Sequence, residues 1–114
     1  MSQLVALAFP VLAGNEGMAR DFVSSVKDKH KEHHNSSKKR RVKREAWFLQ
    51  QLPGSSTLIS FIETDDVEKA LSDFSRSTDP FDVWLKDSAK SITGIDLSMP
   101  RKDPVPETLL SYGF

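Results

Sequence analysis

The sequence contains no cysteine and no long apolar run. Without cysteine, the chain of 114 residues can form no disulfide framework, no thiolate nucleophile and no cysteine-ligated zinc site, which fits a reducing compartment. No segment approaches the roughly 18 apolar residues that a membrane-spanning helix needs. The apolar N-terminal segment "LVALAFPVLAG" lacks the basic residues that precede a signal-peptide core, and we read it as a first strand. We therefore predict a cytoplasmic protein.

The sequence also lacks the motifs of the common enzyme classes. It has no GxSxG nucleophile motif and no phosphate-binding glycine loop. Neighbouring carboxylates occur at Asp65 with Asp66 and at Asp79 with Asp82. Each pair stands at an expected helix start, where capping and the helix dipole explain it. No catalytic residue is identified, and whether the protein is an enzyme stays open.

Charge is unevenly distributed, although the net charge is zero. Residues 27–45 hold nine basic and three acidic side chains, against seven basic and thirteen acidic elsewhere. Such a cluster could contact nucleic-acid phosphates, but no aromatic residues or binding motif accompany its charges. We predict that residues 35–43 form a solvated connection, whose charges could dock on the acidic helices of a partner copy.

Three histidines stand in this basic segment. His30 and His34 are four residues apart on a predicted helix, a spacing that could hold a divalent metal ion. A third ligand is missing because Glu32 points to another side of that helix. We predict no metal site and no cofactor. His30 prolongs the apolar stripe of the helix and is expected at a pocket mouth, with His33 and His34 in solvent.

Periodicity and turn signals predict the order β, α, β, β, α, β, the last helical region being in two pieces. Strands are expected at residues 3–9, 44–52, 57–63 and 95–99. Helices are expected from the cap residue Asn15 through the stripe Met18, Phe22 and Val26, from Asp65, and from Asp79 to Gly94. This is the α+β, ferredoxin-like order: an antiparallel four-stranded sheet with helices on one face, formed by residues 1–100.

The predicted strands are apolar on both faces. In the first strand, Leu4, Ala6 and Ala8 point to one side, and the intervening residues point to the other. Because helices cover only one face, a second copy packed sheet on sheet is the simplest cover for the other. We predict a homodimer, with the Pro-rich tail of residues 101–114 packing on the partner subunit.

Taken together, the element order, the segment "FPVLAGNEG" and the predicted dimer resemble the dimeric α+β barrel superfamily. Within it, "REAWFLQQ", "DDVEKALSDFSRSTDPFDVWLKD" and "GIDLS" resemble a bacterial family of uncharacterised stand-alone proteins. The superfamily includes cofactor-independent monooxygenases, haem-degrading enzymes and stress-responsive proteins, so the fold alone does not choose a function. Members that oxidise polycyclic substrates or haem use an Asn and a Trp; neither Asn15 nor Asn35 falls in a matching strand position. A haem-ligating helical histidine would correspond to His30.

The aromatic residues indicate where a ligand would lie. Trp47 on a strand and Trp84 on a helix are expected to line the cleft between sheet and helices, with a glutamine as a polar group. Arg44 and Glu45 are adjacent on a strand, so one of them is expected to face the cleft or the interface. The ligand-pocket candidates are Trp47, Trp84, His30, Gln50, Gln51 and Arg44.

Two functions fit these features. The first is binding of a small apolar or aromatic ligand in the cleft, including a cofactor-independent monooxygenase-like enzyme. The second is a non-enzymatic stress-response or protein-interaction module. A polar-lined void of roughly some hundreds of Å³ beside Trp47 and Trp84 favours the first, and a cleft filled by side chains favours the second.

Overall fold

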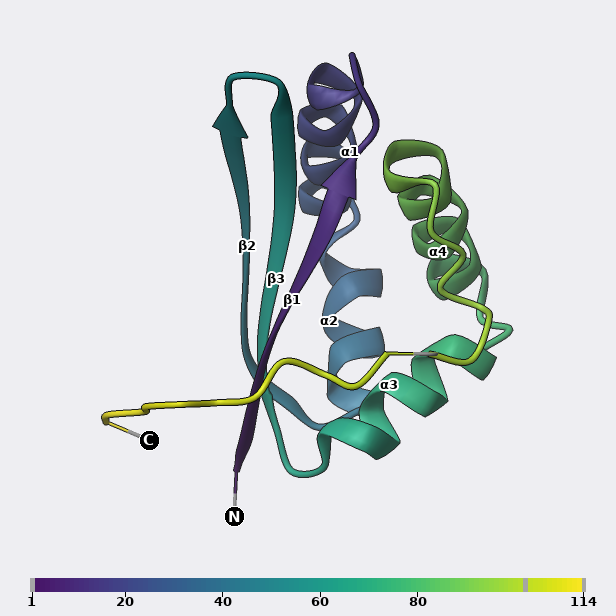
Figure 1. Cartoon of the computed structure of the whole chain (residues 1–114). Helices are drawn as coiled ribbons and strands as arrows, with labels where there is room; N and C mark the ends of the chain where they lie inside the picture. The colour runs from purple at the N-terminus through teal and green to yellow at the C-terminus, as the bar shows by residue number, and fades with distance from the viewer. Residues whose placement is uncertain (1, 102, 114) are drawn as a thin grey trace.

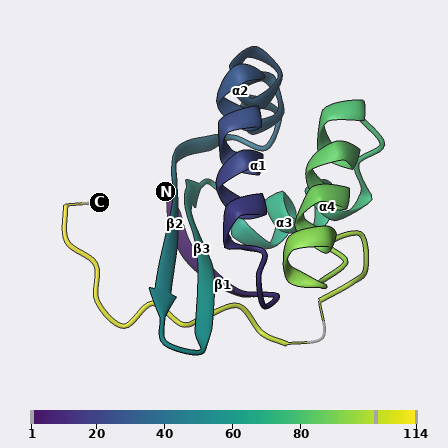
Figure 2. The ribbon, with the colours of Figure 1, turned by 90° about the horizontal axis from the view of Figure 1, so that it is seen from above.

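A computed structural model describes residues 2–101 and 103–113, which fold into one antiparallel sheet with helices on one face (Figures 1 and 2). The sheet has three strands in the order β1-β3-β2: β1 (Gln3–Val11), β2 (Val42–Leu52) and β3 (Ser55–Thr64). The helices of the described residues are α1 (Glu16–Asp28), α2 (His30–Lys39), α3 (Val67–Arg76) and α4 (Pro80–Thr93). The predicted α+β class is confirmed.

The predicted hairpin is present, and β3 is the central strand. Leu52 and Ser55 form the last pair of the β2–β3 ladder, and Gly54 in the turn between them has a φ of 80°. The β1 strand runs two residues further than predicted, through Pro10 to Val11. Since β3 is the one strand among the described residues that pairs with β1, β1 is an edge strand, where proline is tolerated.

The predicted fourth strand at residues 95–99 is wrong. Gly94 ends α4 in the left-handed region with a φ of 77°, and the Asp96 side chain accepts a hydrogen bond from the Ser98 backbone N–H at 2.9 Å. These contacts make a turn, and Pro100 follows directly. The alternation of apolar and polar residues therefore belongs to a loop, and the sheet has three strands instead of four.

The predicted connection at residues 35–43 is also wrong, because α2 continues through the basic segment to Lys39. No glycine or proline interrupts residues 27–41, so nothing in the backbone ends the helix earlier. A short break at Lys29 separates α1 from α2. Arg41, with a φ of 56°, then turns the chain into β2.

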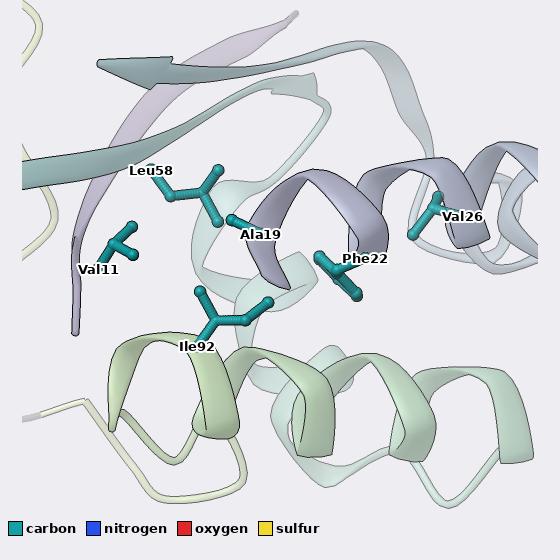
Figure 3. Packing of buried hydrophobic residues seen from close by; sticks show 6 residues of the cluster. All are labelled: Val11, Ala19, Phe22, Val26, Leu58 and Ile92. Carbon is teal, nitrogen blue, oxygen red and sulfur yellow. The ribbon is translucent and has the colours of Figure 1, made fainter. Parts of the chain in front are cut away.

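The main hydrophobic core lies between the sheet, α1 and α4 (Figure 3). Predicted stripe residues Phe22 and Val26 are buried there, but Met18 is 46% exposed because Ala19 faces the core instead. A second cluster packs where α3 meets the sheet. The buried residues of the main core are Val11, Ala19, Phe22, Val26, Leu58 and Ile92, and those of the second cluster are Val5, Leu7, Ile62 and Val67.

A buried polar cluster, which we call the Asp82 cluster, joins α2, α4 and the segment after α3. Asp82 is 1% exposed and accepts hydrogen bonds from the hydroxyls of Ser36 and Ser77, the latter at 2.6 Å. The Arg40 guanidinium lies 3.6 Å from Asp82. Lys86 Nζ donates to the Ser75 and Ser77 carbonyls at 2.9 and 2.8 Å. Asp82 is thus a buried ion-pair partner, and its predicted capping role is wrong.

The other acids at the helix starts divide between capping and ion pairs. Asp66, and not Asp65, caps α3 by accepting from the Lys69 backbone N–H at 3.1 Å. Asp65 instead pairs with Lys43 at 2.9 Å. Asp79 precedes α4 without a side-chain cap bond and pairs with Lys39 on α2. Basic side chains of the 27–45 segment therefore contact acids of their own chain.

The sheet face opposite the helices, which we call the open face, is not covered by any helix of the described residues (Figure 2). Phe48 and Leu52 lie on this face and are more than half exposed. Arg44 also points there and forms an ion pair with Glu63 at 2.7 Å. The open face is therefore an apolar surface with a charged pair at one end.

The C-terminal tail is extended, with no helix or strand in its described residues 101 and 103–113. Val105 packs on the second cluster. Beyond it, the tail passes the β1 edge and runs to the open-face side of the sheet (Figures 1 and 2). Leu109, Leu110 and Tyr112 of the tail are 86%, 89% and 94% exposed. The tail thus carries large apolar side chains away from the body of the domain.

Candidate functional site

A cavity of about 120 Å³ lies between the sheet and the helices. All three strands contribute to its wall, together with α1, α3, α4 and the segment after α4. The wall is mostly apolar, and its larger side chains are Phe9, Phe22, Trp47, Leu58, Phe74 and Leu85. Four polar residues interrupt it: Arg40, Glu45, Ser60 and Thr93.

Ser60 accounts for free volume at the centre of the sheet. It lies on β3 between the apolar residues Leu58 and Ile62 of the same face, and opposite Leu7 and Trp47 on the neighbouring strands. A serine side chain is much smaller than the leucine and isoleucine beside it. Among the residues that the structure describes, none hydrogen-bonds to its hydroxyl. The position therefore offers both space and an unused polar group.

Glu45 is the carboxylate of the cavity and is held by three donors. One carboxylate oxygen, Oε1, lies 2.7 Å from His33 Nε2 and 3.4 Å from the Ser37 hydroxyl. The other, Oε2, accepts from Trp47 Nε1 at 2.9 Å. With a side-chain exposure of 19%, Glu45 is largely removed from water. Its position on β2 places it on the helix-covered face, two residues before Trp47.

Opposing effects act on the pKa of Glu45. Burial raises the pKa, but the hydrogen bond and charge of His33, the hydrogen bond from Trp47 and the charge of Arg40 outweigh it. The net pKa lies below its usual value, so Glu45 is ionised near neutral pH. An ionised carboxylate can only accept hydrogen bonds, which assigns a proton to His33 Nε2.

Arg40 connects the cavity to the Asp82 cluster. Its guanidinium lies over the Phe74 ring, 4.7 Å from the centroid, and donates to the Ser36 hydroxyl at 2.7 Å. Burial lowers the pKa of Arg40, while the charges of Asp82 and Glu45 oppose that shift. Arg40 therefore has its polar and aromatic partners within the protein, although it borders the cavity.

Five rings form a closed circuit beside the cavity. Phe22 stacks on Trp47 with centroids 5.7 Å apart and contacts Trp84 at 5.5 Å. His33 contacts Trp47 at 5.8 Å and Phe81 at 6.1 Å, and Phe81 returns to Trp84 at 5.7 Å. This circuit fixes Trp47 from both sides, so its indole is a rigid part of the cavity wall.

The two tryptophans of the predicted pocket occupy different places. Trp47 lines the cavity. Trp84 lies one ring further away, behind Phe22, with Lys29 over its ring at 5.2 Å. Of the two tryptophans expected in the pocket, Trp47 therefore lines the cavity, and Trp84 packs against a residue of the cavity wall.

The remaining predicted residues lie outside the cavity lining. His30 is exposed on α2, and the half-buried histidine of this segment is His33, which was expected in solvent. Gln51 is exposed and accepts a hydrogen bond from Arg20 of α1. Gln50 and Arg44 lie on the open face.

Sequence reasoning missed Ser60 and His33 as site residues, and it left open which of Arg44 and Glu45 faces the cleft; the structure places Glu45 there. A signal for Glu45 was available, because a buried tryptophan N–H needs an acceptor and Glu45 shares the face of Trp47 two residues away. Ser60 is a polar interruption in an apolar alternating row. His33 had no such signal, since its position depends on where α2 packs against β2.

Two further features of the described residues concern metal ions and membranes. No group of three or more His, Asp or Glu side chains within them is placed to hold a metal ion. His34, the expected partner of His30, is exposed on α2 as well. No helix formed by the described part of the chain is both long and apolar enough to cross a membrane.

Comparison with protein-family models, with curated proteins and with solved structures finds no match.

Proposed function

We propose that the protein binds a small apolar ligand in the cavity between sheet and helices. The observation that carries the proposal is an apolar cavity of about 120 Å³ with a few polar groups in its wall. Ligand sites in proteins combine apolar walls with a small number of polar groups in this way. An engineered apolar cavity of roughly 150 Å³ in another protein takes up benzene.

The volume limits the ligand. Pockets for drug-sized molecules start at roughly 300 Å³, more than twice the volume here. A ligand of one ring or a short branched chain matches the cavity, and a polycyclic molecule exceeds it. A monooxygenase-like reaction remains a hypothesis, and on these grounds its substrate would be a single-ring compound.

A benzene titration followed by two-dimensional NMR tests the proposal. We expect shifts of the Trp47 indole N–H signal and of the lining residues. Ser60→Leu fills the cavity and should abolish them, whereas Ser72→Leu, at an exposed position of α3, should leave them intact. Saturable binding that survives in Ser60→Leu would place the ligand elsewhere and refute the proposal.

We further propose that the domain is ferredoxin-like and forms a homodimer of the dimeric α+β barrel type. The strand order β1-β3-β2 and the helices that follow β1 and β3 on one face support a ferredoxin-like domain that lacks its fourth strand. The exposed Phe48 and Leu52 on the open face support a second copy as its cover. The tail supports it too, because it runs to the open-face side of the sheet and carries the exposed Leu109 and Leu110.

A protein-interaction module is the second candidate function. The observation that favours it is the same open face with its exposed tail, which a different protein could cover. Sedimentation of the purified chain at micromolar concentration separates the two. A dimer supports self-association, and a stable monomer would contradict the proposed homodimer and favour another partner.

A further inference from the structure

The polar groups in the cavity wall restrict the chemistry of the ligand. We infer that the ligand is a neutral single-ring alcohol of the phenol class, whose hydroxyl donates to Glu45 and accepts from Ser60. This inference rests on the proposed function, since it requires that the cavity takes up a ligand. It adds which atoms recognise that ligand.

Glu45 has acceptor capacity left. A carboxylate offers about four acceptor positions. Within the described part of the chain, three donors use them: two reach Oε1 and one, from Trp47, reaches Oε2. Because the carboxylate borders an apolar cavity and its side chain is only 19% exposed, a ligand that fills the space leaves its remaining position little access to bulk water. A ligand donor there would make a charge-assisted hydrogen bond.

Ser60 provides a second polar contact from the neighbouring strand. Glu45 pairs with Ile62 and Trp47 pairs with Ser60, so Glu45 and Ser60 are diagonal neighbours on the same face of the sheet. Diagonal pairs are separated by roughly 7 Å, which leaves room for one ligand oxygen within hydrogen-bond reach of both side chains. A hydroxyl suits this position because it donates and accepts at the same time.

Charge excludes the other common head groups. A carboxylate or phosphate would face the ionised Glu45 in a poorly hydrated space, where repulsion is strong. A cation would be attracted by Glu45 but repelled by Arg40, which borders the same cavity. It would also exchange its hydration shell for apolar walls, which disfavours its binding. A phenolic hydroxyl, with a pKa near that of tyrosine, about 10, is neutral at pH 7.

The walls favour an aromatic body. The Trp47, Phe22 and Phe74 rings all border the cavity, and rings gain from packing against rings beyond their area alone. The circuit of stacked rings holds Trp47 in place, so the wall is already formed before a ligand arrives. Benzene should therefore also bind, but it would leave Glu45 and Ser60 unused.

Calorimetric titration with phenol and with benzene at pH 7 tests the inference. The proteins compared are wild type, Glu45→Gln and the matched control Glu68→Gln, which lies at an exposed position of α3. We expect the phenol-to-benzene affinity ratio to fall about tenfold in Glu45→Gln, the difference between a charge-assisted and a neutral hydrogen bond. Benzene affinity should stay within about twofold, and Glu68→Gln should match wild type.

The outcomes separate the two proposals. If neither compound binds wild type, the proposed function fails. If both bind and the ratio is unchanged in Glu45→Gln, only the inference fails. Loss of both benzene binding and NMR chemical-shift dispersion would show that Glu45→Gln does not fold. In that case the phenol-to-benzene affinity ratio of Ser60→Ala tests the inference. That variant removes one hydroxyl and should lower the ratio by about threefold, and an unchanged ratio would overturn the inference.

Discussion

The two faces of the sheet are both apolar, but they use polar residues differently. On the helix-covered face, Glu45 and Ser60 interrupt apolar rows beside a cavity. On the open face, Arg44 pairs with Glu63 and Gln50 is exposed. Polar groups enclosed beside free volume indicate a ligand site, whereas an uncovered apolar surface indicates a macromolecular contact. On this basis we propose small-molecule binding at the covered face and association at the open face.

Removing Asp82 should have the largest effect, because it breaks the cluster that ties the helices of the covered face together. Asp82→Ala leaves Arg40 buried without its carboxylate, and we expect a loss of about 3–5 kcal/mol in the free energy of unfolding. Urea denaturation measures it. Asp87→Ala, at an exposed position of α4, should cost less than about 0.5 kcal/mol. Equal losses in the two variants would show that the cluster does not hold the helices.

A charge on the open face should affect association and spare the cavity. Phe48→Asp places a carboxylate in the proposed dimer contact, and we expect the dimer dissociation constant to rise about 100-fold. Val83→Asp, on the outer side of α4, is the control. Sedimentation equilibrium measures both. The assignment of faces would be contradicted by an unchanged dissociation constant, or by loss of benzene binding in a folded Phe48→Asp protein.

Acid should destabilise the covered face through its two carboxylates. Burial raises the pKa of Asp82, but the hydrogen bonds from Ser36 and Ser77 and the charge of Arg40 outweigh it, so the pKa is lowered, as it is for Glu45. Their contribution to stability is therefore present above the unfolded pKa values near 4 and is lost as pH falls through the lower folded values.

Urea unfolding at pH 7, 4 and 3 measures this dependence. We expect the free energy of unfolding to fall from pH 4 to pH 3, and to fall less steeply in Glu45→Gln and in Asp82→Asn. A profile in Glu45→Gln parallel to that of wild type would show that the Glu45 carboxylate is not held as described.

The strands and helices with strong local signals could be predicted. The acids before Val67 and Pro80 after Asp79 mark two helix starts, although the cap of the first is Asp66 and not the predicted Asp65; Gly94 marks an end. The turn at Gly54 marks the hairpin. These features depend on neighbours in sequence, so they were visible without the structure.

Features that depend on tertiary contacts could not be predicted. Residues 95–99 alternate like a strand, but they pair with none of the strands that the structure describes, and Leu97 lines the cavity instead. The composition of the basic segment is that of a connection. Its helix α2 is held by a tertiary contact, the hydrogen bond from Ser36 to Asp82 on α4, which the sequence does not show. For the site, alternation identified the face of Trp47, but both faces of β2 are apolar, so it could not show that Gln50 and Arg44 lie on the uncovered one.

Substitutions of those two residues should have the smallest effect on ligand binding. Gln50→Ala and Arg44→Ala alter only the open face, and we expect benzene affinity to change by less than about twofold, since neither side chain lines the cavity. NMR titration measures this. A tenfold loss in a folded Gln50→Ala protein would show that the ligand binds on the open face.

The most direct test of the account is the measurement of intermolecular nuclear Overhauser effects between bound benzene and the methyl groups of the protein. We predict contacts from benzene to Leu58 and Leu85, whose side chains line the cavity. Contacts confined to Leu52, on the open face, would contradict the assignment of the ligand site to the cavity.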